Sequence, residues 1–410
     1  MNKLKGKFIF FSAIAVCMIA FMMTSCEQEA ITNGIDNATN PILDEQFKSY
    51  EIIEIDNETV WNTVESQIDG DVNLEMRKAG SDEVLNWSFN TTRVQVEADD
   101  FELNLVDANG QITAYEMPQT HVLSGQLKGD GTGEIFMGIT KNNLRAEVIQ
   151  GEDTYMIEPL TDYTLDAKPN QYVKYNVEDI IVTGEHTCGM DESQFEFEVE
   201  ATENTNMEER APNCLKVEVM FVGDYNLYAR FGYNFDAAYN WMYWRVVYGG
   251  KRYYAYNGFQ LNLIIKKGWL YTGNVTIATS SNATTYLQQW TNFANNNGSW
   301  IQRGDVNVLF TGKDTGGGTV GVAWLNSICN SYYSSQPPFT FVEYQNSTYL
   351  SNTTTAHEIG HILGAGHSSY GFMTANVTNA NSDMSNYTRN QLNNWVWNND
   401  YCLGWWGCEY

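Results

Sequence analysis

Hydrophobic and polar positions follow two different patterns along the chain, and the change falls near residue 213. Between Trp87 and Leu160, apolar and polar residues alternate in short runs, such as 92–97, 101–106 and 134–139. Asn-Gly, Gly-Asp-Gly and Lys-Asn-Asn turns separate these runs. The pattern predicts a β-rich domain, which we place at residues 81–177.

From residue 213 onward, apolar runs typical of buried strands alternate with segments of helical spacing. The predicted strands lie at 215–222, 259–265 and 306–310, and the predicted helices at 235–247 and 283–295. Strands and helices in this order indicate an α/β fold for residues 213–410, with a mixed twisted sheet and long helices.

The N-terminus has the pattern of an export signal. Three lysines precede an apolar stretch at 8–23, and the small-residue site Thr24-Ser25-Cys26 follows it. We expect residues 1–25 to be a signal peptide and residues 26–80 a polar tether. Because Met23-Thr24-Ser25-Cys26 resembles a bacterial lipobox, we expect lipid on Cys26. An ordinary signal peptide with a coincidental cysteine is the alternative.

The charge of the chain is concentrated before residue 213. The formal net charge is −27, and all of it belongs to residues 1–213, because residues 214–410 hold ten basic and ten acidic side chains. A chain with so few basic residues lacks the positively charged surface that binds phosphate backbones, so we expect no nucleic-acid partner. Residues 178–212 form an acidic linker, in which Arg210 is a candidate cleavage point.

Residues 356–367 read A-H-E-I-G-H-I-L-G-A-G-H and contain the candidate chemistry. On a helix, His357 and His361 lie on one face, and Gly364 permits a break that brings in His367 as a third ligand. Three neutral imidazoles suit Zn²⁺ and leave a position for water, whose pKa the metal lowers. Glu358 is then the expected catalytic acid and base. The alternative is a surface helix with solvated histidines.

This motif resembles the signature of the metzincin zinc peptidases, which includes a downstream Met-turn. Met373 is the candidate for that turn. The wider chain is similar to the reprolysin (adamalysin, ADAM-like) family, although Ser368 follows the third histidine where that family usually has Asp. The segments that carry this similarity are 305–314, 317–323, 328–329, 402–403 and, more weakly, 156–160.

The chain holds seven cysteines, and export places it where disulfides persist. Removing Cys17 of the signal and Cys26 leaves an odd number, so two disulfides would spare one thiol. The remaining cysteines are Cys188, Cys214, Cys329, Cys402 and Cys408.

The resemblance suggests which of these cysteines form disulfides and which one binds the metal. It implies a disulfide between Cys329 and Cys402, and Cys214 with Cys408 is a candidate second pair. Cys188, within residues 186–190, resembles a cysteine switch, in which a thiolate holds the fourth position of the zinc in the latent form. A disulfide between Cys188 and Cys214 is the alternative.

The resemblance therefore implies a metzincin catalytic domain preceded by a β-rich prodomain, made as a latent zinc endopeptidase. We expect a monomer that binds a protein or peptide substrate along an edge strand at 319–325. The lipid would anchor the precursor at the outer membrane or cell surface, and a cut near Arg210 would unmask the zinc and free the catalytic domain. A catalytically idle scaffold that acts as a surface binding or adhesion lipoprotein is the alternative function.

Overall fold

The computed structural model describes residues 40–407 apart from 68, 130–132, 165, 185, 191–212, 260, 298–303, 378–380 and 399–401. The predictions for the signal peptide, Cys26, Arg210 and Cys408 lie outside these residues, as does that for the side chain of Cys214. Within the described part, every helix is too short or too polar to cross a bilayer.

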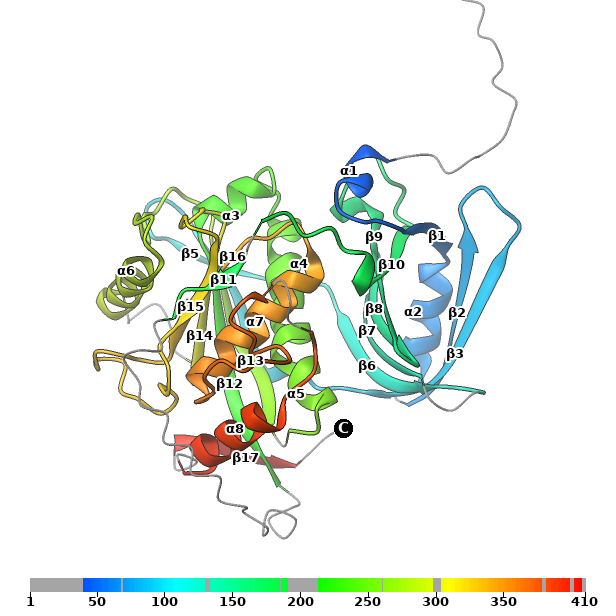
Figure 1. Cartoon of the computed structure of the whole chain (residues 1–410). Helices are drawn as coiled ribbons and strands as arrows, with labels where there is room; N and C mark the ends of the chain where they lie inside the picture. The colour runs from blue at the N-terminus through cyan, green and yellow to red at the C-terminus, as the bar shows by residue number, and fades with distance from the viewer. Residues whose placement is uncertain are drawn as a thin grey trace, which may run out of the picture. The chain divides into compact units, whose positions relative to one another are not determined.

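The first sheet is a closed antiparallel barrel with the strand order β1-β10-β9-β8-β7-β6-β3-β2 (Figure 1). Its strands are β1 (Glu51–Ile55), β2 (Gly70–Lys78), β3 (Val84–Arg93), β6 (Thr120–Leu127), β7 (Glu134–Thr140), β8 (Leu144–Gln150), β9 (Asp153–Pro159) and β10 (Gln171–Asn176). Short helical turns flank them at α1 (Pro41–Asp44), η1 (Leu160–Asp162) and η2 (Val177–Asp179).

The barrel core comes from the alternation of buried and exposed residues along its strands. In β2, Val72, Leu74 and Met76 are buried while their neighbours face solvent. Helix α2 (Asn57–Ser66), capped by Asp56, adds Trp61 and neighbouring side chains to the same core.

The structure places β1, α2 and β2 within the region expected to be a tether, residues 26–80. β1 and α2 are short, which leaves few positions from which to read a pattern. In β2, polar and apolar residues alternate from Asp71 to Arg77, so the sequence does carry the signal of this strand and the prediction of a tether missed it. The barrel therefore begins near residue 51 rather than near residue 81.

The second sheet has the order β11-β15-β16-β14-β12-β13-β4-β5, with β17 paired to β12. Its strands are β4 (Glu97–Val106), β5 (Ile112–Tyr115), β11 (Thr187–Cys188), β12 (Asn213–Gly223), β13 (Leu261–Tyr271), β14 (Val306–Thr311), β15 (Thr319–Ala323), β16 (Phe339–Glu343) and β17 (Gly404–Gly407). β13, β12, β14 and β16 are parallel, and β15 is antiparallel to β16.

Helices accompany this sheet as the sequence pattern predicts. They are α3 (Tyr225–Arg230), α4 (Phe235–Arg245), its continuation through the π-helical η5 (Val246–Arg252) into α5 (Tyr253–Tyr256), α6 (Ala283–Asn296), α7 (Thr348–Ile362) and α8 (Asn386–Asn398). Every residue of β14 is buried, as expected for a strand covered on both faces. The predicted fold class, a mixed sheet with long helices after a β-rich domain, is confirmed.

The hairpin formed by β4 and β5 belongs to the second sheet, although the sequence pattern groups it with the β-rich domain. β4 lies parallel to β13, and β5 is antiparallel to β4. Alternation along a strand shows that one of its faces is buried, but it does not identify the neighbouring strand. The sequence therefore does not reveal that β4 and β5 join the second sheet.

Candidate metal centre

Helix α7 positions two of the three expected histidine ligands. Ser347 caps it by accepting from the Leu350 amide, and all of its residues are buried. His357 and His361 occupy one face, with ring centroids 4.6 Å apart. Because the helix runs through the core, both rings are held in a dry environment.

The third histidine is brought back by a sharp turn at the end of α7. Gly364 has φ of 101°, and a Cβ there would lie 2.4 Å from the side chain of Trp395 in α8. The reversed chain places the His367 ring 5.2 Å from that of His357 and 4.9 Å from that of His361. The three rings therefore converge on one point.

Backbone carbonyls fix which nitrogen of each α7 histidine carries a proton. Nδ1 of His357 lies 2.7 Å from the Phe372 carbonyl, and Nδ1 of His361 lies 2.7 Å from the Ala365 carbonyl. A carbonyl only accepts, so Nδ1 donates in both rings, and a neutral ring then presents the lone pair of Nε2. Burial lowers the pKa of His357 to about 3 and that of His361 well below its usual value, helped by the other histidines.

Met373 packs beneath this part of the helix. It is fully buried, and a Cβ on Gly360, between the two helical histidines, would lie 2.5 Å from its sulfur. The Ser368 amide donates to the Met373 carbonyl over 2.9 Å, which closes the loop after His367. The Met-turn candidate thus packs against α7 at Gly360, the residue before His361.

Glu358 lies between α7 and β15. It is fully buried, and a Cβ on Gly321 would lie 2.6 Å from its Oε1, so the carboxyl packs directly on that glycine. Burial raises the pKa of Glu358 well above its usual value, and a hydrogen bond from Cys188 offsets part of that rise. The sequence gives no sign that Gly321 makes room for this carboxyl.

Cys188 reaches the histidines from a short segment, His186–Gly189, which we call the switch segment. Its sulfur lies 3.4 Å from Nε2 of His361. β11 runs parallel to β15, with Cys188 opposite Gly321, and the Cys188 amide donates to the Ala375 carbonyl over 3.0 Å. Gly189 permits this approach, because a Cβ there would lie 2.7 Å from Val322.

The donor set fits a tetrahedral zinc ion. Ligand atoms of Cys188, His357, His361 and His367 all lie within 4.8 Å of one another. Zinc bonds of ordinary length imply separations of about 3.3 Å between nitrogens and about 3.6 Å between sulfur and nitrogen. The structure has 2.9 Å between Nε2 of His357 and His361, and 3.4 Å from sulfur to His361.

A disulfide joins Cys329 and Cys402, the pair that the family resemblance implies, with Cα atoms 5.6 Å apart. The bond ties the loop after β15 to the segment that precedes β17, across 73 residues of sequence. Cys188 is not in a disulfide.

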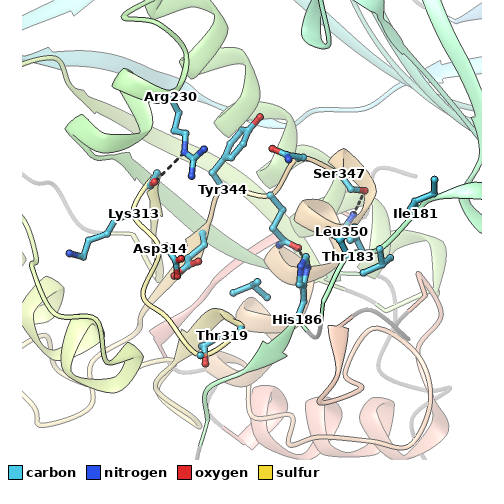
Figure 2. Close-up of a pocket in the computed structure, with 18 residues that line it drawn as sticks. Ile181, Thr183, His186, Arg230, Lys313, Asp314, Thr319, Tyr344, Ser347 and Leu350 are labelled. Carbon is cyan, nitrogen blue, oxygen red and sulfur yellow. Dashed lines mark hydrogen bonds between the residues drawn. The ribbon is translucent and has the colours of Figure 1, made fainter. Parts of the chain in front are cut away.

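A cavity of about 370 Å³ opens beside the N-terminal end of β15. Figure 2 shows His186, Thr319, Tyr344 and Leu350 around it, with charged side chains of the 312–314 loop at its rim. Nδ1 of His186 donates to Oε1 of Gln345 over 3.1 Å, so the switch segment forms one wall of the cavity.

Residues 215–401, a little under half of the chain, match the Reprolysin_5 model, which is described as metallo-peptidase family M12. The family is one of zinc metalloendopeptidases, and the histidine cluster fits zinc as its cofactor.

Two known proteins are similar to this chain. Over 231 residues the chain is 30% identical to the zinc metalloproteinase-disintegrin-like protein atragin of Naja atra, which covers 53% of this chain and 35% of atragin. The chain therefore spans about a third of that relative. The crystal structure of metalloproteinase-II from Bacteroides fragilis matches with a TM-score of 0.50 and 13% identity, over 83% of this chain and 96% of that one, which shows a shared fold.

Proposed function

We propose that this protein is a zinc-dependent endopeptidase that hydrolyses peptide bonds of extracellular proteins and is made as a latent zymogen. The observation that carries the proposal is the convergence of His357, His361 and His367 beside the buried carboxyl of Glu358. A zinc ion held there would polarise a carbonyl and lower the pKa of a bound water, which is the chemistry that amide hydrolysis needs.

Each residue of the site has its own proposed role in the reaction. The three histidines would hold the metal, and the carbonyls of Phe372 and Ala365 orient the two helical rings so that Nε2 of each is left to bind it. Glu358 takes a proton from the attacking water and passes it to the leaving amine. A scaffold without activity gains nothing from this buried carboxyl, whose desolvation costs free energy, so the residue favours an enzyme over an idle binding protein.

Strand β15 is the proposed binding edge for a peptide. A substrate added antiparallel to β15 would cross Glu358 near Gly321 and then run toward Thr319. The cavity beside Thr319 would therefore receive side chains that follow the scissile bond. The switch segment runs parallel to β15, opposite to this direction, so it fills the cleft without presenting a peptide bond in the productive orientation.

Cys188 is the proposed source of latency. Its sulfur faces both the histidines and Glu358, so a thiolate on the metal would take the position of the attacking water. We further propose that lipid on Cys26 anchors the precursor at the cell surface or outer membrane, that Cys214 pairs with Cys408, and that the chain is a monomer whose activation begins with a cut near Arg210.

A peptide-cleavage assay tests the proposed activity. The full-length chain with Cys188→Ala, which lacks the switch thiol, is incubated with a peptide library with and without a chelator, and products are identified by mass. We expect cleavage that the chelator stops and that Glu358→Gln in the same background reduces by about 10³-fold. The matched control Glu218→Gln alters a partly exposed carboxyl and should keep activity. Equal cleavage in every arm would refute the proposal.

A further inference from the structure

The β4–β5 hairpin lies before the acidic linker in sequence, yet it completes the sheet of the catalytic domain. β4 pairs with β13 from Glu97 opposite Ile265 to Val106 opposite Tyr271, with one bulge. Backbone hydrogen bonds close both ends of this pairing, from Ile265 to the Val96 carbonyl and from Thr272 to the Val106 carbonyl, at 2.8 and 2.9 Å. We call the described residues 40–190 the prodomain.

Apolar packing reinforces this pairing. Leu103 of β4 is buried, and a Cβ on Gly268 of β13 would lie 3.0 Å from its methyl group and 2.6 Å from the ring of Phe221. Strand β13 is buried along nearly its whole length. Without β4 it would present a long, apolar edge with unpaired backbone groups, which folded proteins avoid.

The barrel makes a second contact with α4 and η5 of the catalytic domain. The Trp244 ring lies directly on Gly138 of β7, where any Cβ would overlap it. Tyr248 donates to the Phe136 carbonyl over 3.3 Å. Side chains of both parts share one hydrophobic core.

Charges across the same contacts are complementary. Among the described residues, acidic side chains of the prodomain face basic side chains of the catalytic domain in four pairs, of which Glu134 with Arg252 is the longest at 3.9 Å and the other three are shorter. These are Asp100 with Lys266 at 2.6 Å, Glu102 with Lys267 at 2.7 Å, and Glu147 with Arg252 at 3.3 Å. Exposed pairs add little affinity, whereas Glu147 and Arg252 are both buried, so separation of the two parts would require solvent to enter that contact.

We propose that a cut within residues 191–212 leaves a stable complex of two fragments, in which β4 and β5 remain in the catalytic sheet. Cys188 lies on the N-terminal fragment, so the retained prodomain keeps the switch segment in the cleft. This inference rests on the proposed function in one respect: the retained prodomain keeps an enzyme latent only if the chain is a peptidase. Activation then needs a second event, the degradation or displacement of the prodomain, and a lipid on Cys26 would hold the cut enzyme as well as the precursor.

Size-exclusion chromatography with light scattering tests the proposal. The full-length chain carries the recognition sequence of a specific protease within 191–212 and is cut to completion. We expect both fragments to elute together at the mass of the uncut chain, at protein concentrations of about 1 μM. Separation into two peaks at that concentration would overturn the proposal.

A matched pair of variants tests whether the hairpin holds the fragments. Leu103→Asp places a charge in the buried contact, whereas Ile112→Asp makes the same change at an exposed position of β5. After the cut, we expect Leu103→Asp to weaken the complex by about 100-fold or more and Ile112→Asp to leave it intact. Retention by both variants would refute the role assigned to β4.

Hydrogen exchange gives an answer that does not depend on the folding of a variant. The amides of β13 that face β4 should stay as protected in the cut wild-type chain as in the uncut one. Loss of that protection after the cut would contradict the proposal. The chromatography and exchange are repeated with Glu358→Gln, so that self-digestion cannot separate the fragments. A retained complex, together with a Cys188→Ala chain that cleaves no peptide, would refute the proposed function alone.

Discussion

The Nε2 atoms of His357 and His361 lie 2.9 Å apart, although each ring already donates its Nδ1 proton to a backbone carbonyl. In the neutral rings, both Nε2 atoms then direct lone pairs at each other. Two lone pairs at this separation repel, and the folded chain holds them together inside the core. A cation between them converts this repulsion into coordination, so the fold and the metal are expected to stabilise each other.

Removal of the metal should therefore lower thermal stability. Zinc at a thousandfold excess over Kd stabilises a folded protein by about 4 kcal/mol, which corresponds to a shift in Tm of roughly 10 °C for a domain of about 200 residues. Calorimetry of the full-length chain with and without a chelator measures this shift. An unchanged Tm, in a sample shown by elemental analysis to have lost its zinc, would contradict the expectation.

Gly321→Ala should impair catalysis without removing the metal. The added methyl would lie 2.6 Å from Oε1 of Glu358, so the carboxyl must move, and displaced catalytic groups cost about 10²-fold in rate. The measurement is kcat of the Cys188→Ala chain with and without the substitution, beside its zinc content. Gly250→Ala is the matched control, because its methyl would make only ordinary contacts at 3.5 Å and beyond. Equal activity of the two glycine variants would show that Glu358 tolerates the displacement.

Cys188→Ala should release part of the latency of the uncut chain. The substitution removes the thiol that faces His361, while the backbone bonds of the switch segment to β15 remain. We expect peptide cleavage by the uncut chain to rise at least about tenfold, and thiolate-to-metal absorption of a cobalt-loaded chain to vanish. Thr187→Ala, in the same strand, should keep both properties of the wild type. A Cys188→Ala chain with the wild-type spectrum would exclude the thiol from the metal.

The metal motif was readable in the sequence because it is local. His357, Glu358 and His361 lie within two helical turns, and Gly364 follows where the helix must end. The periodicity also predicts the strands of the catalytic sheet, since continuous apolar runs such as 306–310 are typical of buried strands.

The sequence alone could not reveal the partners of these residues. Gly321 accommodates Glu358, and Gly360 accommodates Met373, through contacts between segments far apart in the chain. The pairing of β4 with β13 is hidden for the same reason, because a strand's own pattern does not encode its neighbour. The spacing of the cysteines likewise left the pairing of Cys329 open, and only the family resemblance suggested Cys402.

Glu343, at the end of β16, should make stability depend on pH. Burial raises its pKa to about 7, above the value of 4.5 expected in the unfolded chain, although Thr315 donates to it. The folded state then binds this proton more tightly, so its contribution is complete below the unfolded pKa and is lost as pH rises toward the folded one. Stability contributed by this group falls by on the order of 3 kcal/mol across that window.

Urea unfolding of Glu343→Gln at about pH 5 and about pH 8 measures this effect. Gln keeps an acceptor for the Thr315 amide but carries no charge, so the variant should gain stability relative to the wild type as pH rises. Glu75→Gln alters an exposed carboxyl and should show no such trend. A difference between Glu343→Gln and the wild type that is the same at both pH values would contradict the prediction.

X-ray absorption at the zinc edge of the uncut, full-length chain tests the central claim most directly. We predict one zinc per chain, with three nitrogen neighbours at about 2.0 Å and one sulfur at about 2.3 Å. In Cys188→Ala, the sulfur neighbour should be replaced by a light atom while the nitrogens stay. A chain that binds no stoichiometric zinc, or binds it without the histidine nitrogens, would contradict the account.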